Sequence, residues 1–132
     1  MNQSTNDQPV YHTSFTGRIV APDGIERHFI RGAYGRENDL PSVIYPDGSQ
    51  FWFIENVKRG GMGQPASVQH RDNDLPATIR ANGDQLYYQF GKLHREGGNP
   101  AVIQADGTLK WFEKGKCLAY HLPGDEKRYC SL

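Results

Sequence analysis

The sequence predicts an all-β protein in which tandem β-hairpin repeats of about 24 residues form a single twisted antiparallel meander or a solenoid-like sheet. An Asp-Gly or Asn-Gly pair, the residues favoured in tight hairpin turns, recurs at Gly24, Gly48, Gly83 and Gly107, with spacings of 24, 35 and 24 residues. β-branched residues precede each pair and aromatic residues follow it, which favours a strand on both sides of the turn. No segment has the hydrophobic period of a helix.

Each repeat unit has the same local features at fixed distances from its turn glycine. Four residues before the glycine stand Val20, Ile44, Ile79 and Ile103; four residues after it stand His28, Trp52, Tyr87 and Trp111; the next position holds Phe29, Phe53, Tyr88 and Phe112. In the turn, the glycine adopts positive φ and the Asp or Asn side chain accepts a hydrogen bond from its own backbone. Each unit is therefore expected to be a hairpin followed by a loop.

The unit boundaries follow from a proline and a small residue that open the later units. These pairs are Pro41-Ser42, Pro76-Ala77 and Pro100-Ala101, which give units of about 17–40, 41–64, 76–99 and 100–122. Pro65-Ala66 opens a further copy that lasts only 11 residues, so the spacing of 35 is explained as 24 plus 11. This truncated unit, 65–75, is either a working surface, as irregular insertions in repeat proteins often are, or a neutral remnant.

The two ends of the chain depart from the repeat. Residues 1–10 have no basic start and no apolar run, which predicts a disordered leader before a single domain at 11–132. Residues 118–132 predict a degenerate hairpin around Pro123-Gly124. A two-residue loop there would place Cys117 opposite Cys130, and another loop length would shift them; a reducing cytoplasm favours free thiols.

The pattern of the units resembles the MORN repeat and its variants, which occur in bacterial, phage and large-virus proteins. The resemblance rests on His94-Arg95-Glu96, Pro100-Ala101-Val102-Ile103, Asp106-Gly107 and Trp111-Phe112, and it extends over about 17–122. It implies a β-hairpin repeat architecture. Because related variants include antitoxin-like and protein-binding members, it also implies a scaffold or an inhibitor rather than a catalyst.

Composition narrows the classes of function. The chain has 15 basic and 15 acidic residues, so it lacks the basic excess with which proteins neutralise nucleic-acid phosphates, and no direct nucleic-acid binding is expected. No stretch is apolar enough to span a membrane, and a cytoplasmic location is expected, in the host cytoplasm if a phage encodes the chain. Catalytic motifs are missing and the five histidines are scattered, so we expect no enzyme activity, no cofactor and no metal site.

Arginine–acid pairs recur at Arg36-Glu37, Arg71-Asp72 and Arg95-Glu96, and His70 and His94 precede two of them. A histidine beside a carboxylate could act as a general base. Chemistry, however, needs one asymmetric site, whereas these pairs repeat. We therefore expect them to form a row that stabilises the loops through charge-assisted hydrogen bonds.

Two groups of residues are candidates for a binding site. Trp52, Tyr87 and Trp111, with His28 at the polar end, share one face of the predicted strands, and they form either an exposed row that anchors a protein partner or an internal packing ladder. The segment before the truncated unit contributes Lys58, Arg59 and Met62.

These observations predict a non-enzymatic protein-binding module. A phage-encoded inhibitor of a host defence system, similar to an anti-CRISPR protein, or an antitoxin-like protein would act in this way by stoichiometric binding. The alternative is a structural module, a virion or scaffold component that self-associates through its sheet edges.

Overall fold

The computed structural model describes residues 15–58, 63 and 65–130 of the chain. Within these ranges it contains fifteen β-strands, paired antiparallel, and no helix, which confirms the predicted all-β fold. The strands are β1 (Gly17–Val20), β2 (Glu26–Ile30), β3 (Ala33–Tyr34), β4 (Val43–Ile44), β5 (Gln50–Phe51), β6 (Phe53–Glu55), β7 (Ser67–Gln69), β8 (Thr78–Ile79), β9 (Gln85–Leu86), β10 (Tyr88–Gln89), β11 (Lys92–Leu93), β12 (Val102–Ile103), β13 (Leu109–Glu113), β14 (Lys116–His121) and β15 (Arg128–Tyr129).

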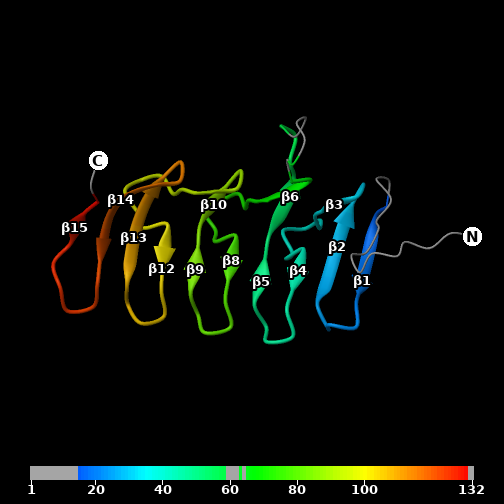
Figure 1. Ribbon diagram of the computed structural model, residues 1–132, viewed down its shortest axis with the longest axis horizontal. Helices are drawn as coiled ribbons and strands as arrows, with labels where there is room; N and C mark the ends of the chain where they lie inside the picture. The colour runs from blue at the N-terminus through cyan, green and yellow to red at the C-terminus, as the bar shows by residue number, and fades with distance from the viewer. Residues whose placement is uncertain (1–14, 59–62, 64, 131–132) are drawn as a thin grey trace, which may run out of the picture.

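Most of these strands belong to one open meander. The eleven-stranded sheet has the order β1-β2-β4-β5-β8-β9-β12-β13-β14-β15, and β3 pairs with β2. Since this order follows the chain, the hairpins lie in a row from one end of the molecule to the other (Figure 1). The short sheets β6-β7 and β10-β11 lie beyond the row, at the end opposite the Asp/Asn-Gly turns.

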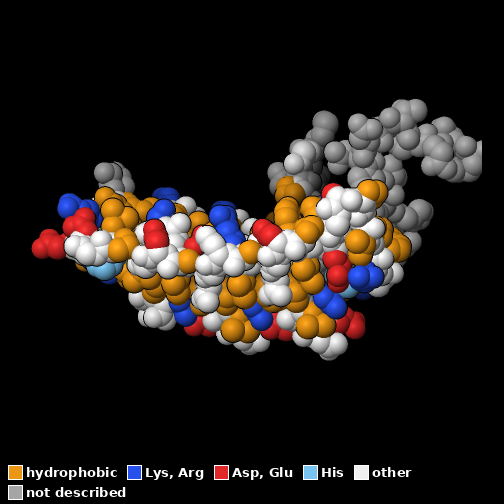
Figure 2. All heavy atoms as spheres, turned by 90° about the horizontal axis from the view of Figure 1, so that it is seen from below, with side chains coloured by type: hydrophobic (Ala, Val, Ile, Leu, Met, Phe, Trp, Pro, Cys, Tyr) orange, Lys and Arg blue, Asp and Glu red, His pale blue; other side chains and the backbone are white. Residues whose placement is uncertain are grey.

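The Asp/Asn-Gly turns share one hydrogen-bond pattern, which explains why the pair recurs. The amide of Gly48 donates to the carbonyl of Tyr45 at 2.9 Å, and the carboxylate of Asp47 accepts from the amide of Ser49 at 2.8 Å. The second bond holds the pKa of Asp47 below its ordinary value of 3.8. Figure 2 views this end of the sheet, where acidic and basic side chains are interspersed along the row.

Each unit also contains a second, oppositely directed hairpin. In three units its loop is a two-residue turn with positive φ at both positions: Arg31-Gly32 (48° and 82°), Phe90-Gly91 (48° and 84°) and Lys114-Gly115 (49° and 84°). These values define the type I′ turn, whose twist matches that of the flanking strands. Every unit therefore bends the chain back twice, once at each end of the sheet.

The second hairpin of the second unit is longer than the others. Phe29 pairs with Tyr34 and Tyr88 pairs with Leu93, whereas Phe53 pairs with Gln69. The separation rises from 5 to 16 residues, which accounts for all 11 extra residues. The pairing therefore assigns 65–75 to the second unit, as the returning strand β7 and its loop, rather than to a separate truncated unit. In Figure 1, the β6-β7 hairpin projects beyond its neighbours.

The core is thin and depends on small side chains. Ser42, Ala77 and Ala101 follow the unit-opening prolines and are at most 1% exposed. Val43 and Val102, each the next residue along, are also buried. Such a column leaves no room for larger side chains, which explains the Pro-small pattern in the sequence.

The C-terminal residues form the hairpin β14-β15, in which Ala119 pairs with Tyr129. Cys117 and Cys130 are joined by a disulfide, with their Cα atoms 5.9 Å apart, so the prediction of free thiols is wrong. The loop is longer than the Pro123-Gly124 dipeptide, and Cys130 donates its amide to Leu118 rather than to Cys117. The two cysteines are therefore diagonal neighbours. Disulfides are typical of oxidising compartments, and the cytoplasmic location stays a prediction.

Candidate functional site

The aromatic column that was a candidate binding row is covered at two of its positions. Trp52 and Tyr87 are each 7% exposed. The guanidinium carbon of Arg71 lies 3.8 Å from the ring centroid of Trp52, and that of Arg95 lies 3.9 Å from the ring centroid of Tyr87. These two aromatic residues are a packing ladder, the second alternative above, because an arginine occupies the face that a partner would need.

The covering arginines join each loop to the loop before it. Arg71 donates from Nε and Nη2 to the carboxylate of Asp39 at 3.0 and 3.1 Å, and from Nη1 to the carbonyl of Pro76 at 3.0 Å. Arg95 makes the same contacts with Asp74 and Pro100. The hydrogen bond from Arg95 lowers the pKa of Asp74.

The expected stabilising row of arginines is therefore present, but its acidic partners differ from those expected. The partners are Asp39 and Asp74, which come from the preceding loop, and not the neighbours in sequence, Asp72 and Glu96. Asp39 and Asp74 have φ of 55°, a left-handed conformation that directs these two carboxylates toward the next unit's arginine.

The loop histidines also connect units rather than form a catalytic pair. Nδ1 of His70 accepts a hydrogen bond from the amide of Phe90 at 3.1 Å, and Nδ1 of His94 accepts from the amide of Lys114 at 2.9 Å. The other ring nitrogen of His70 lies 2.8 Å from the carboxylate of Asp72. His28 lies apart from these residues, with Nε2 2.6 Å from the carboxylate of Glu26.

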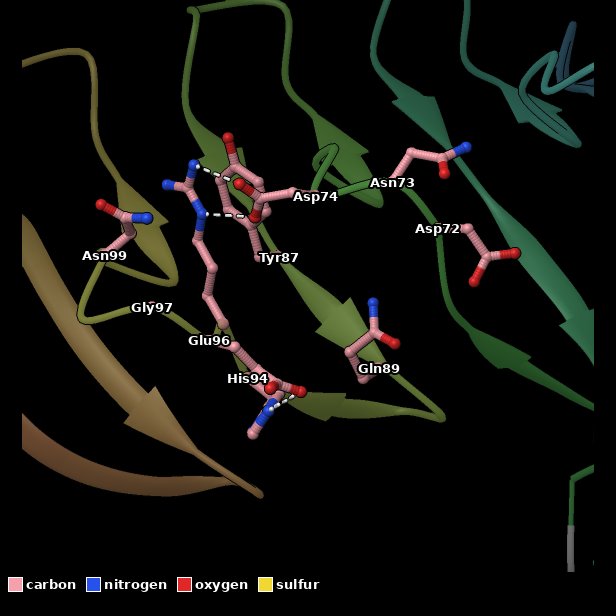
Figure 3. A pocket seen from close by; sticks show the side chains of 10 residues that line it. Asp72, Asn73, Asp74, Tyr87, Gln89, His94, Glu96, Gly97 and Asn99 are labelled. Carbon is pink, nitrogen blue, oxygen red and sulfur yellow. Dashed lines mark hydrogen bonds and ion pairs between the residues drawn. The ribbon is translucent and has the colours of Figure 1, made fainter.

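Three open cavities repeat along this face, one beside each aromatic of the column. Their volumes are about 230 Å³ beside Trp52, 440 Å³ beside Tyr87 and 490 Å³ beside Trp111. Figure 3 shows the middle cavity: Asp72, Asn73 and Asp74 border it from one loop, and His94, Glu96, Gly97 and Asn99 border it from the next. Two of the three are spanned by the repeat's own arginine–aspartate pair.

A fourth cavity, of about 680 Å³, lies beside the long β6-β7 hairpin. We call it the hairpin groove. Its lining residues are Glu55, Asn56, Val57, Lys58, Val68, Gln89, Phe90, Lys92, His94, Glu96 and Lys114. The long hairpin forms one wall and the type I′ turns of the next two units form the other.

Phe90 is the most unusual residue of the hairpin groove. Its side chain is 62% exposed although it is fully apolar, and its φ of 48° is a conformation that bulky residues rarely adopt. The equivalent turn positions hold Arg31 and Lys114, which are ordinary surface residues. Sequence reasoning missed Phe90. The signal that could have found it is the phenylalanine at a turn position where the other two units have a basic residue.

The remaining lining combines apolar surface with charged side chains of both signs. Val57 is 79% exposed beside Phe90. Lys58, Lys92 and Lys114 also line the hairpin groove, and none of them forms an ion pair among the described residues. Of the predicted site residues, Lys58 thus lies in this groove, while Arg59 and Met62 lie outside the described residues.

The described parts of the chain contain no group of three or more His, Cys, Asp or Glu side chains placed to hold a metal ion. They also contain no helix long and apolar enough to cross a membrane. Comparisons of the chain with protein families, curated proteins and solved structures found no match.

Proposed function

We propose that this chain is a non-enzymatic protein-binding module and that its partner docks in the hairpin groove, with Phe90 as the central anchor. The observation that carries this proposal is an exposed phenylalanine at a turn position where the first and fourth units have Arg31 and Lys114. Exposed apolar residues that line a groove are typical of protein-interaction sites.

The surroundings of Phe90 support a protein partner. Protein interfaces bury a small apolar centre, often aromatic, within a polar rim. Phe90 and Val57 supply the apolar centre, and Lys58, Lys92 and Lys114 contribute to the polar rim.

The finer role that we propose is stoichiometric inhibition. The resemblance to MORN-variant repeats supports this proposal, since related proteins include antitoxin-like members. We propose that this inhibitor is encoded by a phage and acts on a host defence system in the host cytoplasm. The repeat, which resembles repeats of phage proteins, and the neutral overall charge both support this form of the role. Identification of the partner from the native host, followed by a measurement of binding stoichiometry, tests this role.

The variant Phe90→Asn tests the groove without damaging the fold. Asparagine before glycine is a favoured type I′ pair, so the turn is retained. The loss of the ring contact with His70, whose centroid lies 4.3 Å away, is offset by relief of the strained φ. We expect the midpoint of thermal unfolding to change by only a few degrees, and we expect the affinity for the purified partner to fall at least thirtyfold, which corresponds to about 2 kcal/mol for a central anchor.

Arg31→Asn is the matched control, because it makes the same change in the equivalent turn of the first unit, away from the groove. It should bind the partner like the unsubstituted chain. Unchanged affinity of a folded Phe90→Asn variant, measured by surface plasmon resonance, would refute the proposal.

A second candidate function, self-assembly through the sheet edges, is favoured by one observation. Tyr129 lies on the terminal strand β15 and is 76% exposed. An uncovered edge strand can pair with another chain. Light scattering distinguishes the two functions, because self-assembly predicts a mass that rises with concentration and falls in a Tyr129→Lys variant.

A further inference from the structure

The internal repeat provides a template for a binding site at its last unit. In the second and third units, a cation lies over the aromatic residue and a carboxylate from the preceding loop holds that cation. The two sets are Trp52 with Arg71 and Asp39, and Tyr87 with Arg95 and Asp74. In the fourth unit, Lys127 takes the place of the arginine, with Nζ 4.3 Å from the ring centroid of Trp111.

The carboxylate is missing from this last set. Gly98 stands where Asp39 and Asp74 stand, three residues after the loop arginine and two before the unit-opening proline. The structure confirms this equivalence: the indole nitrogen of Trp52 donates to the carbonyl of Asp39, and that of Trp111 donates to the carbonyl of Gly98, both at 3.0 Å.

The position at Gly98 has the conformation and the space for the missing group. Its φ of 74° lies in the same left-handed region as the 55° of Asp39 and Asp74. A Cβ atom added to Gly98 would meet nothing within 4 Å. Lys127 makes no ion pair among the described residues. The cation and the aromatic are therefore in place, and a side chain can begin at Gly98 without a clash at its Cβ atom.

The surrounding cavity extends from this gap toward the hairpin groove. Its volume is about 490 Å³, and Gly98, Asn99 and Trp111 line it together with Leu118, which stands where the second and third units have a histidine. The charged groups on its wall are Arg95, Glu96, Glu113 and Lys114. Of the two acids, Glu96 lies 3.6 Å from the ring of His94, which keeps its carboxylate beside another partner. The cavity shares His94, Glu96 and Lys114 with the hairpin groove, so the two form one continuous surface.

We propose that the gap at Gly98 binds an aspartate or glutamate side chain of the protein partner, which completes the Lys127–Trp111 set as Asp39 completes the Arg71–Trp52 set. This inference rests on the proposed protein-binding function and specifies the chemistry of the partner: an acidic residue beside an apolar segment that contacts Phe90. A carboxylate fits because the chain itself uses one at both equivalent positions.

The first experiment is independent of the partner and uses four variants of the full chain, namely two substitutions at Gly98, each with and without Lys127→Ala. Gly98→Asp restores the carboxylate, and Gly98→Asn is the matched control with nearly the same size and no charge. We expect Gly98→Asp to be more stable to urea than Gly98→Asn, and this difference to vanish when Lys127→Ala is added. Equal stability of the two variants, or a difference that survives Lys127→Ala, would overturn the inference.

The second experiment titrates the chain with N-acetylaspartate amide and follows the amide of Gly98 and the indole N–H of Trp111 by NMR. We expect saturable shifts in the millimolar range, and at least tenfold weaker binding in Gly98→Asp. N-acetylasparagine amide should cause no saturable shift. Equal shifts with the asparagine compound, unchanged binding in Gly98→Asp, or binding of inorganic phosphate alone would each overturn the inference.

The two proposals can fail separately. Phe90→Asn should leave the N-acetylaspartate amide titration unchanged, because Phe90 does not line this cavity. A failed titration together with a partner that requires Phe90 would remove only the carboxylate site. A successful titration with a partner that does not require Phe90 would remove only the anchor.

Discussion

Arg71 should stabilise the fold mainly because it covers the ring of Trp52 and donates to the carbonyl of Pro76. Its ion pair with Asp39 should contribute less. Asp39 is 47% exposed, and a pair with such a partner contributes about 0.5–1 kcal/mol. The carbonyl of Pro76 is part of a buried residue, and removal of its donor costs about 1–3 kcal/mol. The stack on Trp52 adds about 0.5–1 kcal/mol. We therefore expect Arg71→Ala to lower the free energy of unfolding by about 3 kcal/mol.

Asp39→Asn isolates the ion pair. Asparagine tolerates the left-handed φ of 55° at this position, so the substitution removes the charge without straining the loop. We expect it to cost about 0.5–1 kcal/mol. Arg71→Lys should fall between the two variants, because lysine keeps the charge and loses the planar fork that reaches Asp39 and Pro76 together.

Urea denaturation monitored by tryptophan fluorescence provides the measurement, and Arg128→Ala is the control. Arg128 is 58% exposed in its pair with Asp125 and caps no buried group, so its removal should change stability by less than about 1 kcal/mol. If Asp39→Asn proved as costly as Arg71→Ala, the ion pair would dominate, and the assignment of the stability to capping and coverage would be refuted.

The remaining predictions concern the core, the turns and the disulfide. Ala77→Leu should destabilise the chain by about 1–3 kcal/mol, because the position is 0% exposed, and a lowered urea midpoint checks this. The hydrogen bond from the amide of Thr108 lowers the pKa of Asp106 below its ordinary value of 3.8. Asp106 therefore stabilises the fold above pH 3.8 and loses this contribution as the pH falls through its folded-state pKa. The Asp106→Asn variant should lose less stability on acidification, as measured by acid titration followed by circular dichroism. Reduction of the Cys117–Cys130 disulfide, which joins residues 13 apart, should lower stability by about 3 kcal/mol in urea melts with and without dithiothreitol, and a Cys130→Ser variant should not respond to the reductant.

The sequence predicted the repeated architecture because each turn is specified locally. Asp47-Gly48 and its counterparts form their hydrogen bonds within a few residues, so the hairpins could be inferred without knowledge of the tertiary structure. The arginine row could be inferred for the same reason, since Arg36, Arg71 and Arg95 keep one place in the unit.

The features that sequence reasoning missed depend on three-dimensional relations. The partner of Arg71 is Asp39, 32 residues away, because the loop turns that carboxylate toward the next unit. The 11 extra residues give the same spacing wherever they are inserted, so the period alone could not place them in the β6-β7 hairpin. The pairing of Cys117 with Cys130 depends on a loop length that no repeat column fixes.

The arginine–aspartate and amide–histidine hydrogen bonds between neighbouring loops run in one direction along the chain. Arg71 and Arg95 donate to carboxylates of the loop before them, and the amides of Phe90 and Lys114 donate to histidines of the loop before them. During synthesis, which proceeds from the N-terminus, each emerging unit therefore meets acceptors that have already left the ribosome. These four contacts are suited to vectorial folding, in which a completed loop provides acceptors for the loop that follows.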